Sequence, residues 1–177
     1  MNTAATQRRQ RGLTLVETMI VLAVIAVAAG VVAPSFEQAR ERRHVEGIAA
    51  QLETDFAYTR SLAVAQNRTL RMNFADDRCY VVHAGSPTTC TCAADGSASC
   101  SSGADVLRVV QLAPGTPATM VSNSKSIGFD AMKGTVTPTA TVKVIGTRGA
   151  TLHNVINLMG RVRSCAPAPG LPGHKTC

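Results

Sequence analysis

The chain has 177 residues and a net charge of +7, and only 3% of its residues are aromatic, with no tryptophan. This length leaves one domain of ordinary size once the N-terminal apolar segment is set aside. The scarcity of aromatic residues argues against a large aromatic-lined ligand pocket and against base stacking as the main mode of nucleic-acid binding. No Ser-His-Asp, paired-carboxylate or phosphate-loop pattern is present, and the 4 histidines are scattered over different predicted elements. We therefore expect neither an enzyme nor a bound cofactor.

At the N-terminus, a basic leader is followed by an apolar run that carries a single acid. Several arginines precede Gly12, and between residues 13 and 33 the only charged residue is Glu17. About 20 apolar residues are enough for a helix to span a bilayer. A carboxylate at this depth is costly, so it needs a partner. Cleavage after Gly12 would supply one, because it would leave a positive amine on Leu13 close to Glu17 of the same or a neighbouring subunit.

Two other interpretations explain part of this segment. A secretory signal peptide also begins basic and turns apolar, but it needs a small-residue cleavage site after the apolar run. Residues 28–33 form only a poor site of that kind. A simple membrane anchor explains the length of the run but not the presence of Glu17.

The segment GLTLVE at residues 12–17, followed by an apolar run up to Pro34, resembles the class III signal of type IV pilins and pseudopilins. The resemblance implies that a prepilin peptidase cuts after Gly12 and methylates the new N-terminus at Leu13. It also implies that Glu17 guides docking of the subunit into a helical filament. The expected location is a single pass through the inner membrane with the C-terminal domain in the periplasm, and the cell surface after pilus assembly.

A helical pattern continues beyond the apolar run. Apolar residues recur at mostly three- to four-residue spacing, and they are Phe36, Val45, Ile48, Leu52, Phe56 and Ala63. Charged residues are expected on the opposite face, among them Arg40, Glu41, Arg42, Arg43 and Glu53. Asn67 is a plausible stop signal. We therefore expect one helix from residue 14 to about residue 66, bent near Pro34.

Beyond Asn67 the pattern changes to short strands. They are expected at residues 69–74, 79–84, 106–112, 126–129, 140–145 and 151–158, with a long surface loop at 85–104 and irregular structure at 113–125 and 166–173. The expected fold class is α+β, a type IV pilin-like fold in which a long N-terminal helix packs on an antiparallel β-sheet. The expected divisions are a leader (1–12), a membrane or filament-core helix (13–34), its amphipathic continuation (35–67) and a β-rich domain (68–177).

The chain contains six cysteines, at Cys79, Cys90, Cys92, Cys100, Cys165 and Cys177. An even number in an exported protein indicates disulfides formed in an oxidising compartment. Proximity favours a bond between the last two, which leaves the other four to pair among themselves. Cys90 and Cys92 are too close to bond comfortably to each other, so each is expected to reach one of the outer two. A metal site is disfavoured, because one C-x-C and two single cysteines do not match the spacing of zinc knuckles.

Two further segments resemble the GspH/FimT family of minor pilins and pseudopilins. Residues 52–74 are similar to its helix-to-strand passage, and residues 156–165 (INLMGRVRSC) are similar to the C-terminal Gly-Arg-x-Arg signature of the FimT branch. That branch is implicated in binding DNA during uptake by natural transformation. The resemblance therefore implies a minor pilin that assembles with other pilins and binds DNA through Gly160, Arg161 and Arg163.

The charge distribution agrees with a polyanionic partner, because no Asp or Glu occurs between residues 131 and 177. On an extended chain Arg161 and Arg163 would project to the same side about 7 Å apart, close to the spacing of phosphates along one nucleic-acid strand. Each guanidinium can bind a phosphate through two hydrogen bonds. Gly160 would let the backbone turn and approach a polyanion closely. The charge distribution adds four candidate DNA-binding residues, Lys133, Lys143, Arg148 and Lys175.

Two alternatives involve no DNA. The protein could be a structural minor pilin that primes pilus assembly, or a minor pseudopilin of a type II secretion system. In both cases the arginines would be solvated or would pair with acids on a neighbouring subunit. The acid-free C-terminal stretch argues against both, because docking on a protein surface needs mixed charge and apolar area.

Overall fold

The computed structural model describes residues 14–85 and 90–177. The chain divides into two compact units, the first ending at Gln38 and the second beginning at Ala39. Gly12 and Leu13, which flank the predicted cleavage site, lie outside the described residues. The core of the second unit positions the candidate site.

A single helix, α1, runs from Leu15 to Ala65, as the sequence pattern predicts. The Thr14 hydroxyl accepts the backbone N–H of Glu17 (3.3 Å), which satisfies one of the free donors at the helix start. Asn67 adopts a left-handed conformation (φ 48°) just beyond the last turn, where an asparagine is well tolerated. The described side chains up to Gly30 are exposed, and this part of α1 is long and apolar enough to cross a membrane.

The strands form two antiparallel sheets and a hairpin. The first sheet has the order β5-β2-β1-β7-β8, the second has the order β11-β10-β9-β6, and β3 pairs with β4. The first sheet consists of β1 (Leu70–Phe74), β2 (Cys79–Ala84), β5 (Asp105–Gln111), β7 (Ser126–Phe129) and β8 (Val136–Thr137). The second consists of β6 (Ala118–Ser122), β9 (Ala140–Gly146), β10 (Thr151–Ile156) and β11 (Val162–Cys165). The hairpin is formed by β3 (Cys90–Cys92) and β4 (Ala98–Cys100), and a short 3-10 turn, η1 (Ser101–Gly103), follows it.

All six predicted strands are confirmed to within a residue or two. The prediction was wrong where it left segments irregular, because β6 falls within 113–125 and the β3–β4 hairpin falls within 85–104. Two further strands, β8 and β11, were not predicted. Each missed strand is short. β6 pairs with β9, the β3–β4 hairpin and β11 are each tied by a disulfide, and β8 pairs with the neighbouring β7.

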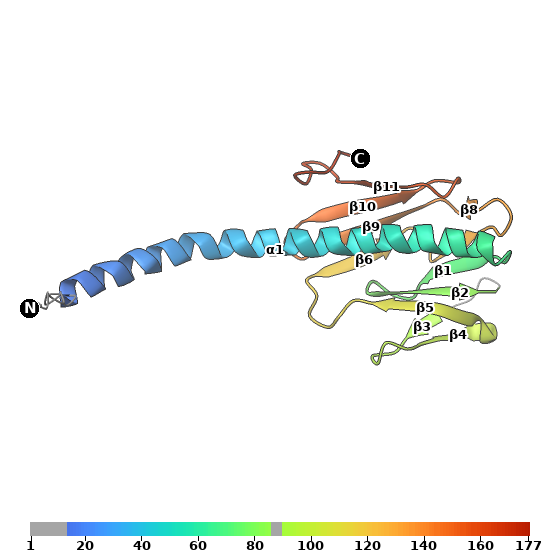
Figure 1. The fold of residues 1–177 in the computed structure, drawn as a ribbon, viewed down its shortest axis with the longest axis horizontal. Coiled ribbons are helices and arrows are strands. Elements are labelled where there is room, and N and C mark those ends of the chain that lie inside the picture. The colour runs from blue at the N-terminus through green and yellow to red at the C-terminus, as the bar shows by residue number, and fades with distance from the viewer. Residues whose placement is uncertain (1–13, 86–89) are drawn as a thin grey trace, which may run out of the picture. The chain divides into compact units, whose positions relative to one another are not determined.

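The second half of α1 packs across both sheets, as Figure 1 shows. Val45, Leu52 and Phe56 are at most 1% exposed, and the Phe56 ring lies 6.1 Å from that of Phe129 on β7. Burying a side chain of this size contributes about 1.5–3 kcal/mol. Phe36 was expected on the same stripe, but it is 66% exposed. It belongs to the unit that ends at Gln38, ahead of the part of α1 that carries the core.

Glu41 also departs from the expected pattern, because it is buried and not on a solvated face. Its carboxylate accepts backbone N–H groups of Arg148 (2.9 and 3.0 Å) and Ala150 (3.3 Å) in the β9–β10 turn. Gly146 leaves space for this carboxylate, since an added Cβ would overlap Glu41 Oε1. The buried charge is therefore compensated by donors that the helical periodicity does not reveal.

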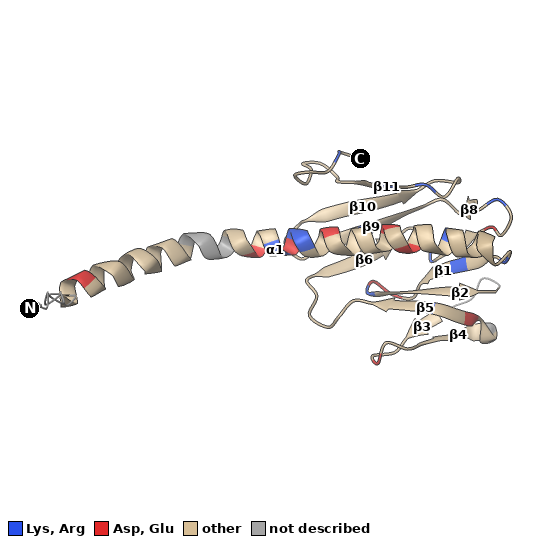
Figure 2. Cartoon of the chain, in the orientation of Figure 1, with Lys and Arg blue, Asp and Glu red and all other residues tan. Residues whose placement is uncertain are grey.

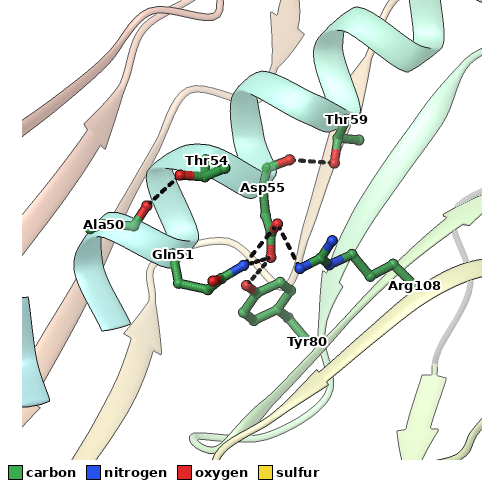
Figure 3. Close-up of polar contacts among 7 residues, drawn as sticks. All are labelled: Ala50, Gln51, Thr54, Asp55, Thr59, Tyr80 and Arg108. Carbon is green, nitrogen blue, oxygen red and sulfur yellow. Dashed lines mark hydrogen bonds and ion pairs between the residues drawn. The ribbon is translucent and has the colours of Figure 1, made fainter. Parts of the chain in front are cut away.

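A second buried carboxylate joins α1 to the first sheet (Figure 3). Asp55 accepts the hydroxyl of Tyr80 on β2 (2.6 Å) and the amide of Gln51 (3.1 Å), and it forms an ion pair with Arg108 on β5 (3.2 Å). Burial, followed by the hydrogen bond to Asp55, raises the pKa of Tyr80 above its ordinary range. On the other side of the helix, the buried Asn154 of β10 donates to the carbonyl of Ala49 (2.9 Å). These bonds fix the helix against both sheets.

All six cysteines are in disulfides. Cys165 bonds to Cys177, as proximity predicted, and Cys90 and Cys92 bond to Cys100 and Cys79. The first of these bonds ties the C-terminal segment to β11. Cys79–Cys92 ties the β3–β4 hairpin to β2, and Cys90–Cys100 joins β3 to β4 within the hairpin. No cysteine is free in this structure.

Candidate nucleic-acid interface

The β10–β11 turn holds the Gly-Arg-Val-Arg segment in a fixed conformation. Gly160 has a φ of +71°, a conformation that favours glycine, and its N–H donates to the carbonyl of Asn157 (2.9 Å). The N–H of Arg161 donates to the Asn157 side chain (2.9 Å), and the Arg161 carbonyl accepts the Asn157 N–H (3.1 Å). Arg161 therefore projects from a turn that is closed by its own hydrogen bonds.

Arg163 lies on the face of the second sheet that is turned away from α1. On β11, the Ser164 hydroxyl donates to Glu53 of α1 (3.1 Å), so the preceding residue, Arg163, points to the opposite face. Within residues 14–85 and 90–177, Arg161 and Arg163 are both exposed and neither forms an ion pair. Both guanidiniums are therefore available to an external anion.

Lys143 shares this outer face. It pairs with His153 of β10, which in turn pairs with Cys165 of β11, and directly opposed residues lie on one face of a sheet. Lys143 and Arg163 are thus separated by one intervening strand, about 10 Å sideways. Burial, and to a lesser degree the charge of Lys143, lowers the pKa of His153. The imidazole therefore adds no positive charge to this face at neutral pH.

Gly160 has a second structural role besides the expected turn. Its turn conformation is as expected, but the side on which a side chain would stand is filled by Arg60 of α1. An added Cβ would lie 2.8 Å from Arg60 Cδ and 3.1 Å from the carbonyl of Gly134. The absent side chain therefore makes room for an arginine of the same molecule.

Arg60 is a cation that the sequence analysis missed. Its Nε donates to the carbonyl of Gly134 (2.9 Å) in the β7–β8 loop. Lys133 precedes Gly134 in the sequence, and Arg161 follows Gly160. Three cations, from α1, the β7–β8 loop and the β10–β11 turn, therefore lie at one end of the second unit. We call Arg60, Lys133 and Arg161 the turn cluster. Figure 2 shows Lys and Arg at this end, in the β7–β8 loop and near the β10–β11 turn.

The other candidates do not join this cluster. Arg148 lies in the β9–β10 turn, at the opposite end of β10, where its backbone is bound to Glu41. Lys175 lies in the C-terminal segment, where its carbonyl accepts the N–H of Ala166 (2.9 Å). The next residue back, His174, lies 3.7 Å from Glu46. The seven candidates are therefore distributed over two ends and one face of the second sheet, and they do not form one continuous patch.

The β7–β8 loop contains one acid, Asp130, and its carboxylate binds backbone N–H groups of its own turn. Asp130 Oδ1 accepts the backbone N–H groups of Met132 (3.0 Å) and Lys133 (2.8 Å). This arrangement closes the loop and directs one carboxylate oxygen to the backbone of its own turn. The described residues contain no group of three or more potential metal ligands. The chemistry available at this end is therefore the binding of anions by side-chain cations.

Comparisons with known proteins agree with this architecture. Residues 49–160 match the family described as type II transport protein GspH, and residues 7–33 match the prokaryotic N-terminal methylation motif. The comparison with curated proteins found no match. The family match ends at Gly160, so Arg161 and Arg163 lie just beyond it.

Among solved structures, the fold is similar to that of the type IV minor pilin FimU of Pseudomonas aeruginosa. In one crystal form the identity is 19% and the TM-score is 0.54, over 76% of this chain and 96% of FimU. In a second crystal form the identity is 17% and the TM-score is 0.52, over 73% and 98%. Likeness at this identity concerns the fold, whereas the family match spans more than half of the chain. The chain therefore belongs to the GspH family of minor type IV pilins and pseudopilins.

Proposed function

We propose that this chain is a minor type IV pilin whose basic C-terminal residues bind extracellular DNA for uptake during natural transformation. The observation that carries the proposal is the exposure of Arg161 and Arg163 on a hydrogen-bonded turn and strand, without an ion-pair partner among the described residues. Lys133 and Lys143 extend this surface, whereas Arg148 and Lys175 would contact only a longer stretch of DNA.

Binding of this kind uses the phosphate backbone. Guanidiniums bind phosphate oxygens bidentately, and such contacts carry no sequence information. Each neutralised phosphate contributes about −0.9 to the slope of log affinity against log salt on duplex DNA. A small number of contacts therefore gives weak binding that falls as salt rises and is nearly independent of sequence.

The same proposal includes processing and assembly. A prepilin peptidase would cleave after Gly12, and the new N-terminus at Leu13 would neutralise Glu17 of the same or a neighbouring pilin. The methylation motif and the apolar first half of α1 support this step. The β-rich part would face the periplasm before assembly and the medium afterwards.

The test uses the full chain purified in detergent with its disulfides oxidised. Labelled duplex DNA is titrated at several salt concentrations with the wild type and with Arg161→Ala/Arg163→Ala. The matched control is Arg42→Ala/Arg43→Ala, which removes the same charge from exposed positions of α1. We expect the first variant to lose most of the affinity and about 2 units of salt slope, and the control to behave as the wild type. Equal behaviour of the two variants would mean that net charge alone drives binding and that the Gly-Arg-Val-Arg assignment is wrong.

A second candidate is supported by exposed apolar side chains at the same end. Met132, Leu158 and Met159 are 82%, 51% and 64% exposed, and apolar area of this kind is typical of protein docking surfaces. The chain would then be a structural minor pilin or a type II secretion pseudopilin that contacts another subunit. In that case wild-type protein would not bind DNA, and Met132→Ser/Met159→Ser would impair filament assembly.

A further inference from the structure

We propose that Arg60 of α1 is a further DNA-contacting residue, and that Gly134 and Gly160 lack side chains because they hold its guanidinium in place. This inference rests on the proposed DNA-binding function and extends it from the C-terminal strand to the helix. It assigns the turn cluster as one phosphate-binding surface built from α1, the β7–β8 loop and the β10–β11 turn.

The Arg60 side chain is held between two turns that belong to different sheets. An added Cβ at Gly160 would lie 2.9 Å from Arg60 Nε, and one at Gly134 would lie 3.1 Å from the same atom. Both glycines have positive φ, +71° and +60°. The two turns are also joined directly, since the N–H of Val136 donates to the carbonyl of Leu158 (2.8 Å). The stem of Arg60 is therefore fixed before any ligand arrives.

The hydrogen bonding of Arg60 leaves its outer nitrogens for a ligand. Nε donates to the Gly134 carbonyl (2.9 Å), and within the described residues the guanidinium has no carboxylate partner. A guanidinium anchored through Nε presents its two Nη groups as a planar pair, which suits a phosphate. The acid of the adjacent loop, Asp130, binds the backbone of its own turn. A salt bridge within the protein therefore does not explain this arginine.

The surface beside Arg60 is open. A groove at this position is lined by Ala57, Arg60, Ser61, Val64, Ala65 and Gly160. Most of these side chains are small, so a bulky sugar-phosphate backbone can approach the guanidinium without displacing them. Lys133 and Arg161, which are the sequence neighbours of Gly134 and Gly160, are exposed. Their positive charge favours a polyanion as the occupant of this surface.

The test adds Arg60→Gln and Arg60→Lys to the salt titration of the full chain, with Arg42→Gln as a control at an exposed position of the same helix. We expect Arg60→Gln to weaken binding about 3- to 10-fold and to lower the salt slope by about 1 unit. Arg60→Lys should restore the slope, because it keeps the charge. A purely structural arginine would change thermal stability in both variants and leave the slope of the folded protein unchanged.

A measurement on the wild type covers the case in which variants at this position fail to fold. Arginines are modified with phenylglyoxal with and without duplex DNA, and the products are mapped by mass spectrometry. We expect DNA to protect Arg60, Arg161 and Arg163 but not Arg42. Modification of Arg60 at the same rate with and without DNA would overturn the inference.

The outcomes separate this inference from the function on which it rests. If the wild type binds DNA, Arg161→Ala/Arg163→Ala abolishes binding and Arg60 is neither protected nor needed, the inference is wrong and the proposed function stands. If the wild type does not bind DNA, both fail.

Discussion

Replacing Tyr80 by phenylalanine isolates one hydrogen bond between α1 and the first sheet. The ring of Tyr80 is buried and packs 5.7 Å from that of Phe74, and phenylalanine keeps this packing. The variant loses only the hydroxyl that donates to Asp55 at 2.6 Å. Because the acceptor is a buried carboxylate, which is itself 1% exposed, this bond belongs to the stronger class of about 1.5–3 kcal/mol.

The expected loss in the free energy of unfolding is about 2 kcal/mol. It is no larger because Gln51 and Arg108 still bind Asp55 after the change. For a domain of this size, a loss of 2 kcal/mol lowers Tm by about 6 °C. The fragment 39–177 is suitable for the assay, since the buried apolar residues of the described chain all lie between Val45 and Leu171. Urea unfolding followed by circular dichroism gives the free energy of unfolding, with an unchanged m-value if only stability changes.

Tyr58 provides the matched control. It is the chain's other tyrosine, and it lies on α1 with 46% of its surface exposed. Tyr58→Phe should therefore change the free energy of unfolding by less than about 0.5 kcal/mol. Equal effects of the two substitutions would refute the reasoning. A Tyr80→Phe variant as stable as the wild type would show that the bond to Asp55 merely replaces an equally good bond to water.

The remaining predictions concern the pH dependence of stability and the effect of two glycine substitutions. The raised pKa of Tyr80 means that only the unfolded state ionises near pH 10, so stability should fall above that pH, and absorbance should show no tyrosinate from Tyr80 before unfolding. Burial and, to a smaller extent, the charge of Arg71 lower the pKa of His83. As the pH falls, the unfolded state therefore binds the proton first, and stability should fall below about pH 6.5. Urea unfolding midpoints measured against pH should show this fall for the wild type but not for His83→Gln. Gly146→Ala, which would overlap Glu41, should lower the free energy of unfolding by about 1–3 kcal/mol. A Cβ added at Gly47 of α1 would contact no atom within 4 Å, so Gly47→Ala should raise the free energy of unfolding by about 0.5–1 kcal/mol.

Local sequence patterns were sufficient to predict much of the fold. The end of α1 just before Asn67 and the strand Ser126–Phe129 follow from residues within a few positions of each other. The strand Ala118–Ser122 was missed because its weak alternation predicts little by itself. It forms because β9, which is distant in sequence, supplies its hydrogen-bonding partner. Val162–Cys165 was missed because its sequence is polar, and it becomes a strand through hairpin pairing with the preceding strand, β10.

The candidate site was less predictable because it depends on contacts between distant residues. Periodicity predicted that Glu41 lies on a solvated face. In the structure it is buried, and its carboxylate binds the backbone of a turn more than 100 residues away in the sequence. The role of Arg60 depends on Gly134, 74 residues later in the chain, and on the missing side chain of Gly160. Composition identified the excess of cations after residue 131, but it could not tell that Arg148 and Arg161 lie at opposite ends of one strand.

The stapled β3–β4 hairpin has a practical consequence for following this protein in cells. Its tip at Asp95 and Gly96 is exposed, while the disulfides Cys79–Cys92 and Cys90–Cys100 hold its base in a small cluster separate from the main core. A short epitope or peptide tag inserted at this tip disturbs neither the packing of α1 nor the turn cluster, which belong to other parts of the domain. The hairpin is therefore the place to attach a reporter that leaves the turn cluster unmodified.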